Sequence, residues 1–142
     1  MKVLAAILIL ATVAVEQESP RFQPFTVRCD VIGTGPQGER QIIRDTVARK
    51  ANGDQALWTS YAIDHSAGIG FIWVYSERKQ YYISPIGTKE TSRLNEQPEN
   101  YNPGCKQIEM AYPKQRVIQI GDVHLGEPHD SLFDTSLYKE EP

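Results

Sequence analysis

Residues 25–31 read Phe-Thr-Val-Arg-Cys-Asp-Val, and this stretch decides the class of fold. Apolar and polar side chains alternate along it with a period of two, as they do in a half-buried β-strand. The alternation places Cys29 on the apolar side, together with Val27 and Val31. We therefore predict that the folded domain begins with a strand at Phe25.

The next segment, 39–50, fits both one face of a helix and a strand. Asn52-Gly53 follows it directly, and a second extended run comes after at 56–64. Asn-Gly between two extended runs is a strong hairpin signal, which favours a strand. The same dipeptide can also end a helix, so the helical alternative for 39–50 stays open at this point.

Residues 69–76 form the most apolar stretch that follows the N-terminal segment. Both sides of the expected strand are apolar, as in a central strand that is covered on two faces. A polar turn at 77–80 and a further strand at 81–86 come next. Pro85 restricts this strand to an edge or to its last residues. In the rest of the chain, the sequence pattern predicts a polar loop at 87–104, an extended run at 106–111 and a strand at 117–125.

The C-terminal strand carries several apolar side chains at uneven spacing. Gly121 is expected to introduce a bulge that resets the alternation. We expect this bulge to place four residues on one face: Ile118, Ile120, Val123 and Leu125. Three later apolar residues are expected to pack a terminal turn onto the sheet: Leu132, Phe133 and Leu137.

This series of strands predicts a mostly β fold, a single antiparallel meander that forms a curved sheet or half-barrel. The length fits one domain. We place it at 25–138, after a leader at 15–24 and before a polar tail at 139–142.

The first fourteen residues, Met1 to Ala14, have the outline of a cleaved secretory signal. Lys2 is followed by a short apolar run and by small residues near a plausible cleavage site. The apolar stretch 3–15 is shorter than the roughly twenty residues that a membrane-spanning helix needs. We therefore predict a secreted or periplasmic domain with no membrane span after the signal is removed. A buried N-terminal helix or strand is the alternative.

Cys29 and Cys105 are the only cysteines in the chain. In an exported protein, two cysteines and no others predict one disulfide. In a reducing compartment the same pair would be two buried thiols. No histidine lies at metal-finger spacing from either cysteine, so the pair does not indicate a zinc site.

The formal net charge is −3, and no block of basic residues is present. This balance argues against nucleic acid and against anionic lipid as partners. The sequence holds no phosphate-binding glycine loop, His-Glu-x-x-His, Gly-x-Ser-x-Gly or calcium loop. We therefore assign no cofactor and no catalytic residue, and favour a protein that is not an enzyme.

Histidines provide the alternative, an exported hydrolase or metal-dependent enzyme. His124 and His129 lie near Asp122 and Glu127, so this loop has the ligand types of a surface metal site, although its spacing matches no recognised site. Residues 64–66 read Asp-His-Ser, the residue types of a hydrolytic triad. Sequence neighbours on a turn cannot form the relay from nucleophile to base, so we interpret this motif as a polar turn.

Aromatic residues gather on neighbouring strands, and four of them form our candidate ligand-binding set: Trp58, Phe71, Trp73 and Tyr75. The two-sided apolarity of 69–75 is the reason, since one face of this strand can pack the core while the other holds a lipid-like ligand or a protein partner. An ordinary sheet core with cross-strand pairs is the alternative. A purely structural role in the cell envelope is a third hypothesis.

The C-terminal segment 126–133, Gly-Glu-Pro-His-Asp-Ser-Leu-Phe, followed by Tyr138, resembles the closing segment of a group of uncharacterised secreted bacterial proteins. The Asn-Gly-Asp unit within 48–58 and the Pro-Gly-Cys at 103–105 also resemble that group. The series of strands is similar to the half-barrel of lipoprotein-carrier proteins. This chain departs from the pattern, because it has no proline between Phe133 and Tyr138 and its spacing there is one residue shorter. The resemblance implies a β-rich fold and export, and it implies no catalytic or binding residue.

Overall fold

The computed structural model describes residues 21–61 and 68–142. The predicted signal at 1–14, most of the leader and the Asp-His-Ser motif at 64–66 lie outside these residues. The strands of this part of the chain are β1 (Phe25–Thr34), β2 (Arg40–Arg49), β3 (Gln55–Tyr61), β4 (Ile69–Val74), β5 (Lys79–Ile83), β6 (Thr88–Arg93), β7 (Arg116–Leu125) and β8 (Lys139–Glu140). Its helices are α1 (Lys106–Ala111) and the short 3₁₀ helix η2 (Asp130–Phe133). Neither is long and apolar enough to cross a membrane.

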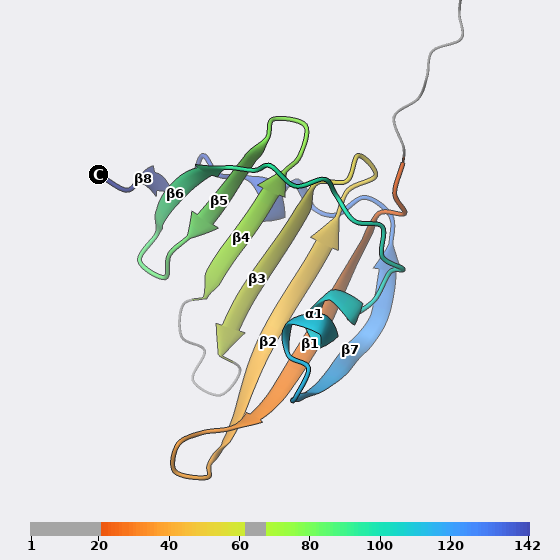
Figure 1. The fold of residues 1–142 in the computed structure, drawn as a ribbon, viewed down its shortest axis with the longest axis vertical. Helices are drawn as coiled ribbons and strands as arrows, with labels where there is room; N and C mark the ends of the chain where they lie inside the picture. Colours follow the sequence, from red (N-terminus) through yellow and green to blue (C-terminus); the bar gives the residue numbers. More distant parts are fainter. Residues whose placement is uncertain (1–20, 62–67) are drawn as a thin grey trace, which may run out of the picture.

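One curved, open sheet contains all eight strands, in the order β7-β1-β2-β3-β4-β5-β6-β8 (Figure 1). The predicted mostly β meander is confirmed, because β1 to β6 are neighbours in chain order and pair antiparallel. After β6, the chain crosses to the far edge and adds β7 antiparallel to β1. The last residues, set apart above as a tail, return to pair in parallel with β6 as β8. The sheet is therefore mixed.

The sheet has two faces, and a different segment covers part of each. On the face that we call the front, α1 packs against β1 and β2, as Figure 1 shows. On the other face, the back, the C-terminal segment 126–142 packs against β3 to β5. The front core contains Phe25, Val27, Cys29, Val31, Val47, Cys105 and Ile108. The back core contains Ala48, Ala56, Ile72 and Ile83, with Leu132, Phe133 and Tyr138 packed against them.

Each cover spans about half of the sheet, and neither core cluster extends over the opposite half of its face in the described residues. One open half lies on the front, over β3 to β6, where the loop 94–104 crosses one end of the strands (Figure 1) and Gln55 and Leu94 are buried. The other lies on the back, over β7, β1 and β2. This diagonal arrangement leaves one uncovered sheet surface on each face.

The extended run predicted at 106–111 is wrong, because these residues form α1. Ile108 and Met110 imitate the alternation of a strand in sequence. In the structure Ile108 is fully buried against the sheet, whereas Met110 is 57% exposed. The disulfide at Cys105 anchors the helix at its first turn, and this tertiary constraint leaves no local signal in the sequence.

The polar loop predicted at 87–104 is also partly wrong, because its first residues form β6. This strand consists of polar and charged residues that are mostly exposed, so it lacks the apolar alternation that identifies a strand. It forms because its backbone completes the ladder along β5. The strand predicted at 81–86 is shifted, since β5 begins at Lys79 and ends before Pro85.

The strand predicted at 39–50 is confirmed as β2, and the hairpin turn follows it. Gly53 has a φ of 99°, a conformation that glycine adopts without strain. The Asn52 side-chain oxygen accepts a hydrogen bond from the Asp54 N–H at 3.0 Å. The Asp54 carboxylate in turn accepts the Tyr75 N–H at 3.0 Å, which ties the turn to the end of β4.

The bulge predicted near Gly121 is confirmed, since the register between β7 and β1 shifts there and Gly121 has a φ of 77°. The predicted apolar face is wrong. Val117 and Val123 pack against the front core, whereas Ile118 and Ile120 lie on the back. Leu125 is 60% exposed. Of the three residues expected to pack a terminal turn onto the sheet, Leu132 and Phe133 pack against it and Leu137 is exposed.

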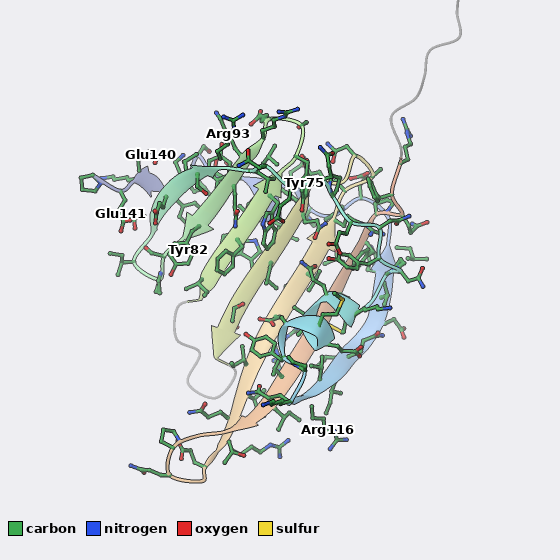
Figure 2. The ribbon with its side chains drawn as sticks, viewed as in Figure 1. Tyr75, Tyr82, Arg93, Arg116, Glu140 and Glu141 are labelled. Carbon is green, nitrogen blue, oxygen red and sulfur yellow. A yellow bond between two sulfur atoms is a disulfide. The ribbon has the colours of Figure 1, made fainter. Side chains whose placement is uncertain are left out.

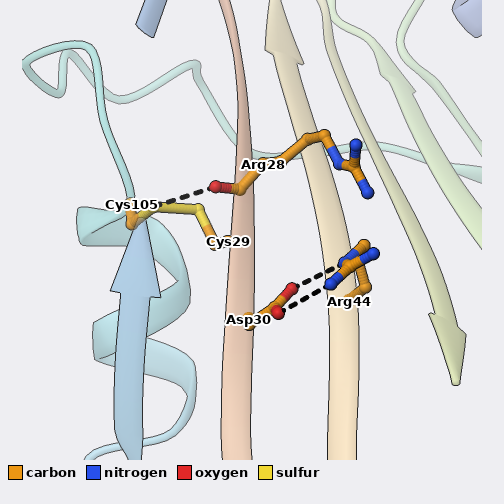
Figure 3. Close-up of polar contacts among 5 residues, drawn as sticks. All are labelled: Arg28, Cys29, Asp30, Arg44 and Cys105. Carbon is orange, nitrogen blue, oxygen red and sulfur yellow. Dashed lines mark hydrogen bonds and ion pairs between the residues drawn. A yellow bond between two sulfur atoms is a disulfide. The ribbon is translucent and has the colours of Figure 1, made fainter. Parts of the chain in front are cut away.

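The predicted disulfide between Cys29 and Cys105 is confirmed (Figure 3). Its Cα atoms are 6.0 Å apart, and both residues are buried. The Cys105 sulfur lies 3.9 Å from the carbonyl oxygen of Arg28. The bond therefore fixes α1 to the middle of β1.

Replacing both cysteines with alanine should lower the free energy of unfolding by about 4 kcal/mol, because the bridge restricts a long loop in the unfolded chain. The bridged residues are 76 positions apart. Urea unfolding followed by tryptophan fluorescence measures the change. A reductant should shift the wild-type curve by a similar amount and leave the double variant unchanged. A loss below about 1 kcal/mol would contradict this expectation.

A second prediction concerns Gly70, which lies opposite Trp58 in the pairing of β3 and β4. A Cβ atom at Gly70 would lie 2.5 Å from the Trp58 ring. Gly70→Ala should therefore cost about 1–3 kcal/mol by displacing the indole, as measured by thermal unfolding. Gly33→Ala in β1 is the matched control. Its Cβ would meet only the Gln115 side chain at 3.4 Å, and its stability should change by less than about 1 kcal/mol.

Candidate binding surface

The open half of the front face carries three aromatic rings in contact. Phe71 and Trp73 lie two residues apart on β4, so their side chains leave the same side of the strand. Their ring centroids are 5.9 Å apart and the planes are tilted by 19°. Tyr82 faces Phe71 from β5, with ring centroids 5.3 Å apart. All three side chains are only partly buried. We call these three residues the aromatic surface.

Strand register extends the aromatic surface with both apolar and polar neighbours. Leu57 pairs with Phe71 across β3 and β4, and packs on its other side against the front core. Gln55 and Gln80 flank Trp73 from the neighbouring strands; Gln55 is buried, whereas Gln80 is partly exposed. The surface therefore offers flat rings together with the amide group of Gln80, which combine apolar contact with hydrogen bonding.

Carboxylates border the aromatic surface on two sides. Glu90 pairs with Tyr82 across β5 and β6 and is exposed. At the other end, the loop 94–104 brings Glu96 and Glu99 close enough to Tyr75 for their charges to act on its phenol. Burial and then the charges of Glu96 and Glu99 raise the pKa of the Tyr75 phenol. The surface therefore has a negative rim, which consists of Glu90, Glu96 and Glu99.

Tyr101, in the same loop, experiences the same negative environment. Burial, then the hydrogen bond that the phenol donates to the Glu99 carboxylate and the charge of that carboxylate, raise the pKa of the Tyr101 phenol to about 12. Tyr101 thus stays a neutral phenol at physiological pH.

The predicted ligand-binding set does not lie on one surface. Phe71 and Trp73 lie on the front, and Tyr75 continues that side beyond the end of β4. Trp58 lies on the back, where its indole N–H donates to the carbonyl oxygen of Leu132 at 3.0 Å and its ring contacts Tyr138. The register of β3 against β4 causes this difference. Phe71 pairs with Leu57 and shares its face, and Trp58, the next residue on β3, points to the opposite face. We therefore separate Trp58 from the candidate surface and add Tyr82.

Arg49 holds the loop 94–104, which carries Glu96 and Glu99 of the negative rim, and sequence reasoning missed this role. Only 1% of this residue is exposed. It donates hydrogen bonds to the carbonyl oxygens of Tyr101, at 2.8 Å, and of Gln23, at 2.8 Å and 3.2 Å. Its guanidinium also lies over the rings of Phe22 and Phe25. An arginine at the end of a strand carries no sequence signal that distinguishes this role from an exposed one.

The histidines of the alternative hypothesis, His124 and His129, do not fall within a cluster of potential metal ligands in the described part of the chain. His124 and His129 are both exposed. Across residues 21–61 and 68–142, no group of three or more histidine, cysteine, aspartate or glutamate residues lies close enough to hold a metal ion. No observation therefore favours a metal-dependent enzyme.

Two open clefts lie on the back, at the border of the C-terminal segment. One has a volume of about 370 Å³ and is lined by Trp58, Ser84 and Tyr138 among others. The second has a volume of about 380 Å³ and is lined by Lys50, Asp54 and Phe133 among others. Lys50 lies 4.5 Å from the centre of the Phe133 ring, which helps to fix the C-terminal segment that contributes to the lining of both clefts.

Comparison with protein-family models, with curated proteins and with solved structures finds no match to this chain. The resemblance to secreted bacterial proteins and to lipoprotein carriers therefore stays a prediction.

Asp45 is a buried carboxylate on the front of β2, beside the disulfide. It pairs with Cys29 on one side and Thr59 on the other, and the Thr59 hydroxyl donates to its Oδ1 atom at 2.7 Å. Its Oδ2 atom has no hydrogen-bond partner among the described residues. Burial raises the pKa of this carboxyl, and the hydrogen bond from Thr59 opposes the shift.

We expect Asp45 to reduce stability as the pH rises. Since its pKa is higher in the folded state, folding favours the protonated form. The destabilisation caused by ionised Asp45 is absent below the pKa of this carboxyl in the unfolded chain, about 4, and complete above its pKa in the folded protein. Asp45→Asn keeps an oxygen that can accept the Thr59 hydroxyl and removes the charge. The stability of this variant relative to the wild type should therefore improve between pH 3 and pH 7, as measured by urea unfolding across about that range.

Asp30→Asn is the matched control with the opposite sign. Hydrogen bonding from Arg44 lowers the pKa of Asp30, so its stabilising effect is lost as the pH falls through the folded pKa. The relative stability of this variant should worsen as the pH rises. A difference between Asp45→Asn and wild type that does not change with pH would contradict the interpretation of Asp45.

Proposed function

We propose that this protein is an exported, non-enzymatic domain that binds an extended polypeptide segment of a partner protein on its aromatic surface. The observation that carries the proposal is the open front half of the sheet, where Phe71, Trp73 and Tyr82 form contacting rings that no core segment covers in the described chain. Large apolar surfaces that remain exposed on a folded domain are frequently sites of interaction.

The chemistry of the surface favours a segment with apolar and basic side chains. The rings of Trp73 and Tyr82 supply apolar contact and attract cations to their faces. The negative rim surrounds these rings from both ends. A lysine or arginine of the partner would gain from both features at once, because cation–π attraction and the carboxylates act in the same direction.

The shape of the surface favours an extended segment. The rings lie along neighbouring strands of a sheet, and the partly exposed amide side chain of Gln80 flanks them. Such a strip matches alternate side chains of an extended chain, which lie on one side at regular intervals. A lipid-like ligand is the other expectation for this surface, and the experiment below distinguishes the two.

The disulfide supports export as part of the proposal. Bonds of this kind persist in oxidising compartments and are rare in the cytosol. The predicted signal at Met1 to Ala14 agrees with a secreted or periplasmic location. Detection of the mature N-terminus by mass spectrometry of exported protein tests this part directly.

Selection of displayed peptides tests the proposed partner. Random peptides would be selected on the wild-type domain and counter-selected on a Trp73→Ala/Tyr82→Ala variant. We expect peptides that combine aromatic or aliphatic residues with lysine or arginine. Their affinity should fall at least about tenfold in the variant, because truncating a central aromatic residue typically costs more than 1 kcal/mol.

Two control variants make the result specific. Met110→Ala removes a similarly large exposed side chain from α1, outside the aromatic surface, and should leave peptide affinity unchanged. Glu90→Gln should lower the affinity for basic peptides a few-fold and leave the affinity for neutral peptides unchanged. Selected peptides that bind the Trp73→Ala/Tyr82→Ala variant with the same affinity as the wild type would overturn the proposal. A co-purifying lipid in native mass spectrometry, lost with Trp73→Ala, would assign the surface to a lipid instead.

A further inference from the structure

The open half of the back face gathers arginine and isoleucine side chains from three strands. Their positions follow from the register, in which residues directly opposite each other lie on the same side of the sheet. The rows across β7, β1 and β2 are Ile120–Arg28–Thr46, Ile118–Asp30–Arg44 and Arg116–Ile32–Ile42. We call these residues the basic surface.

The charge of the basic surface is opposite to that of the whole protein. Its three arginines face a single carboxylate, Asp30, which lies between Arg28 and Ile32 on β1. Arg44 neutralises this carboxylate through two hydrogen bonds of 2.8 Å and 2.9 Å (Figure 3). Arg28 and Arg116 are exposed, and no ion pair joins either to a carboxylate in the described residues. The net charge of the chain is −3, so this positive region stands apart from the rest.

The isoleucines give the same surface an apolar character. Ile32, Ile42 and Ile118 are half-buried, and Ile120 is 36% exposed. The aliphatic stems of arginine can lie along such side chains while the guanidinium groups reach outward. The result is an apolar sheet surface with cationic groups at its outer level.

We propose that the basic surface docks this protein onto a bilayer that contains anionic phospholipid. Arginines attract the phosphate groups of the lipids, and isoleucines between them insert among the headgroups. A bilayer fits better than an acidic protein because the surface is broad, and most of its uncharged side chains are isoleucines that offer no hydrogen bond. A specific protein interface would combine its charges with more hydrogen-bonding groups.

This docking is independent of the proposed peptide binding. The basic surface is on the back of the sheet and the aromatic surface is on the front, over different strands. A domain that lies on a membrane through its back would keep the aromatic surface accessible to a partner. Each proposal can therefore fail without the other.

Vesicle sedimentation tests the docking. The mature protein would be mixed with vesicles of phosphatidylcholine alone or with about 30% phosphatidylglycerol, in about 0.1 M salt, where charges more than about 10 Å from the bilayer are largely screened. We expect binding only to the anionic vesicles, and loss of binding at about 0.5 M salt. Arg28→Gln/Arg116→Gln should lower the partition coefficient by about 30-fold, since each arginine near an anionic surface contributes about 1 kcal/mol.

Matched variants separate docking from general charge. Lys79→Gln/Arg93→Gln removes the same charge from a cross-strand pair on the same face, at the other end of the sheet from Arg116 (Figure 2). It should lower binding less than about threefold. Arg28→Lys/Arg116→Lys keeps the charge and should retain binding, which guards against a folding defect. Equal loss in both Gln variants, or equal binding to neutral vesicles, would overturn the proposal. A protein that does not bind the vesicles but does bind poly-glutamate would also overturn the proposal, and would indicate an acidic protein partner.

Discussion

The buried guanidinium of Arg49 connects three parts of the chain that are far apart in sequence. It lies at the end of β2 and holds the segment before β1 through Gln23, and the loop after β6 through Tyr101. Burying a charge costs several kcal/mol unless hydrogen bonds and other charges compensate. Here carbonyl oxygens and two aromatic rings, not a carboxylate, provide the compensation. The entry of the chain into the sheet and the course of the loop toward α1 therefore both depend on one side chain.

The position of this loop decides which parts of the sheet are covered. The loop carries the chain from β6 to the far side of the molecule, where Cys105 fastens α1 over β1 and β2. The C-terminal segment then crosses the back in the reverse direction. Because the two covers lie diagonally, each face retains an open half. The two halves have opposite character, aromatic with a negative rim on the front and basic with isoleucines on the back.

Sequence reasoning identified the strands whose apolar side chains alternate or are continuous, such as those at 25–31 and 69–76. It missed β6, whose residues are polar and whose pairing depends on a neighbour. It also mistook α1 for an extended segment, because its burial follows from a distant disulfide. The candidate site was only partly predictable for a related reason. Trp58 and Trp73 look equivalent in sequence, and only the register of β3 against β4 places them on opposite faces.

The parallel strand β8 has a consequence for the order of folding. Residues 139–140 pair with β6, and the segment before them completes the back core over Ile72 and Ile83. A growing chain that has reached only the end of β7 has all of its antiparallel strands, but the apolar back of the sheet is still bare. Contacts between such distant segments form slowly and leave intermediates open to aggregation. The native packing of this sheet therefore becomes available only after synthesis has passed residue 140, and chaperones have the interval between β7 and β8 in which to bind the unfinished chain.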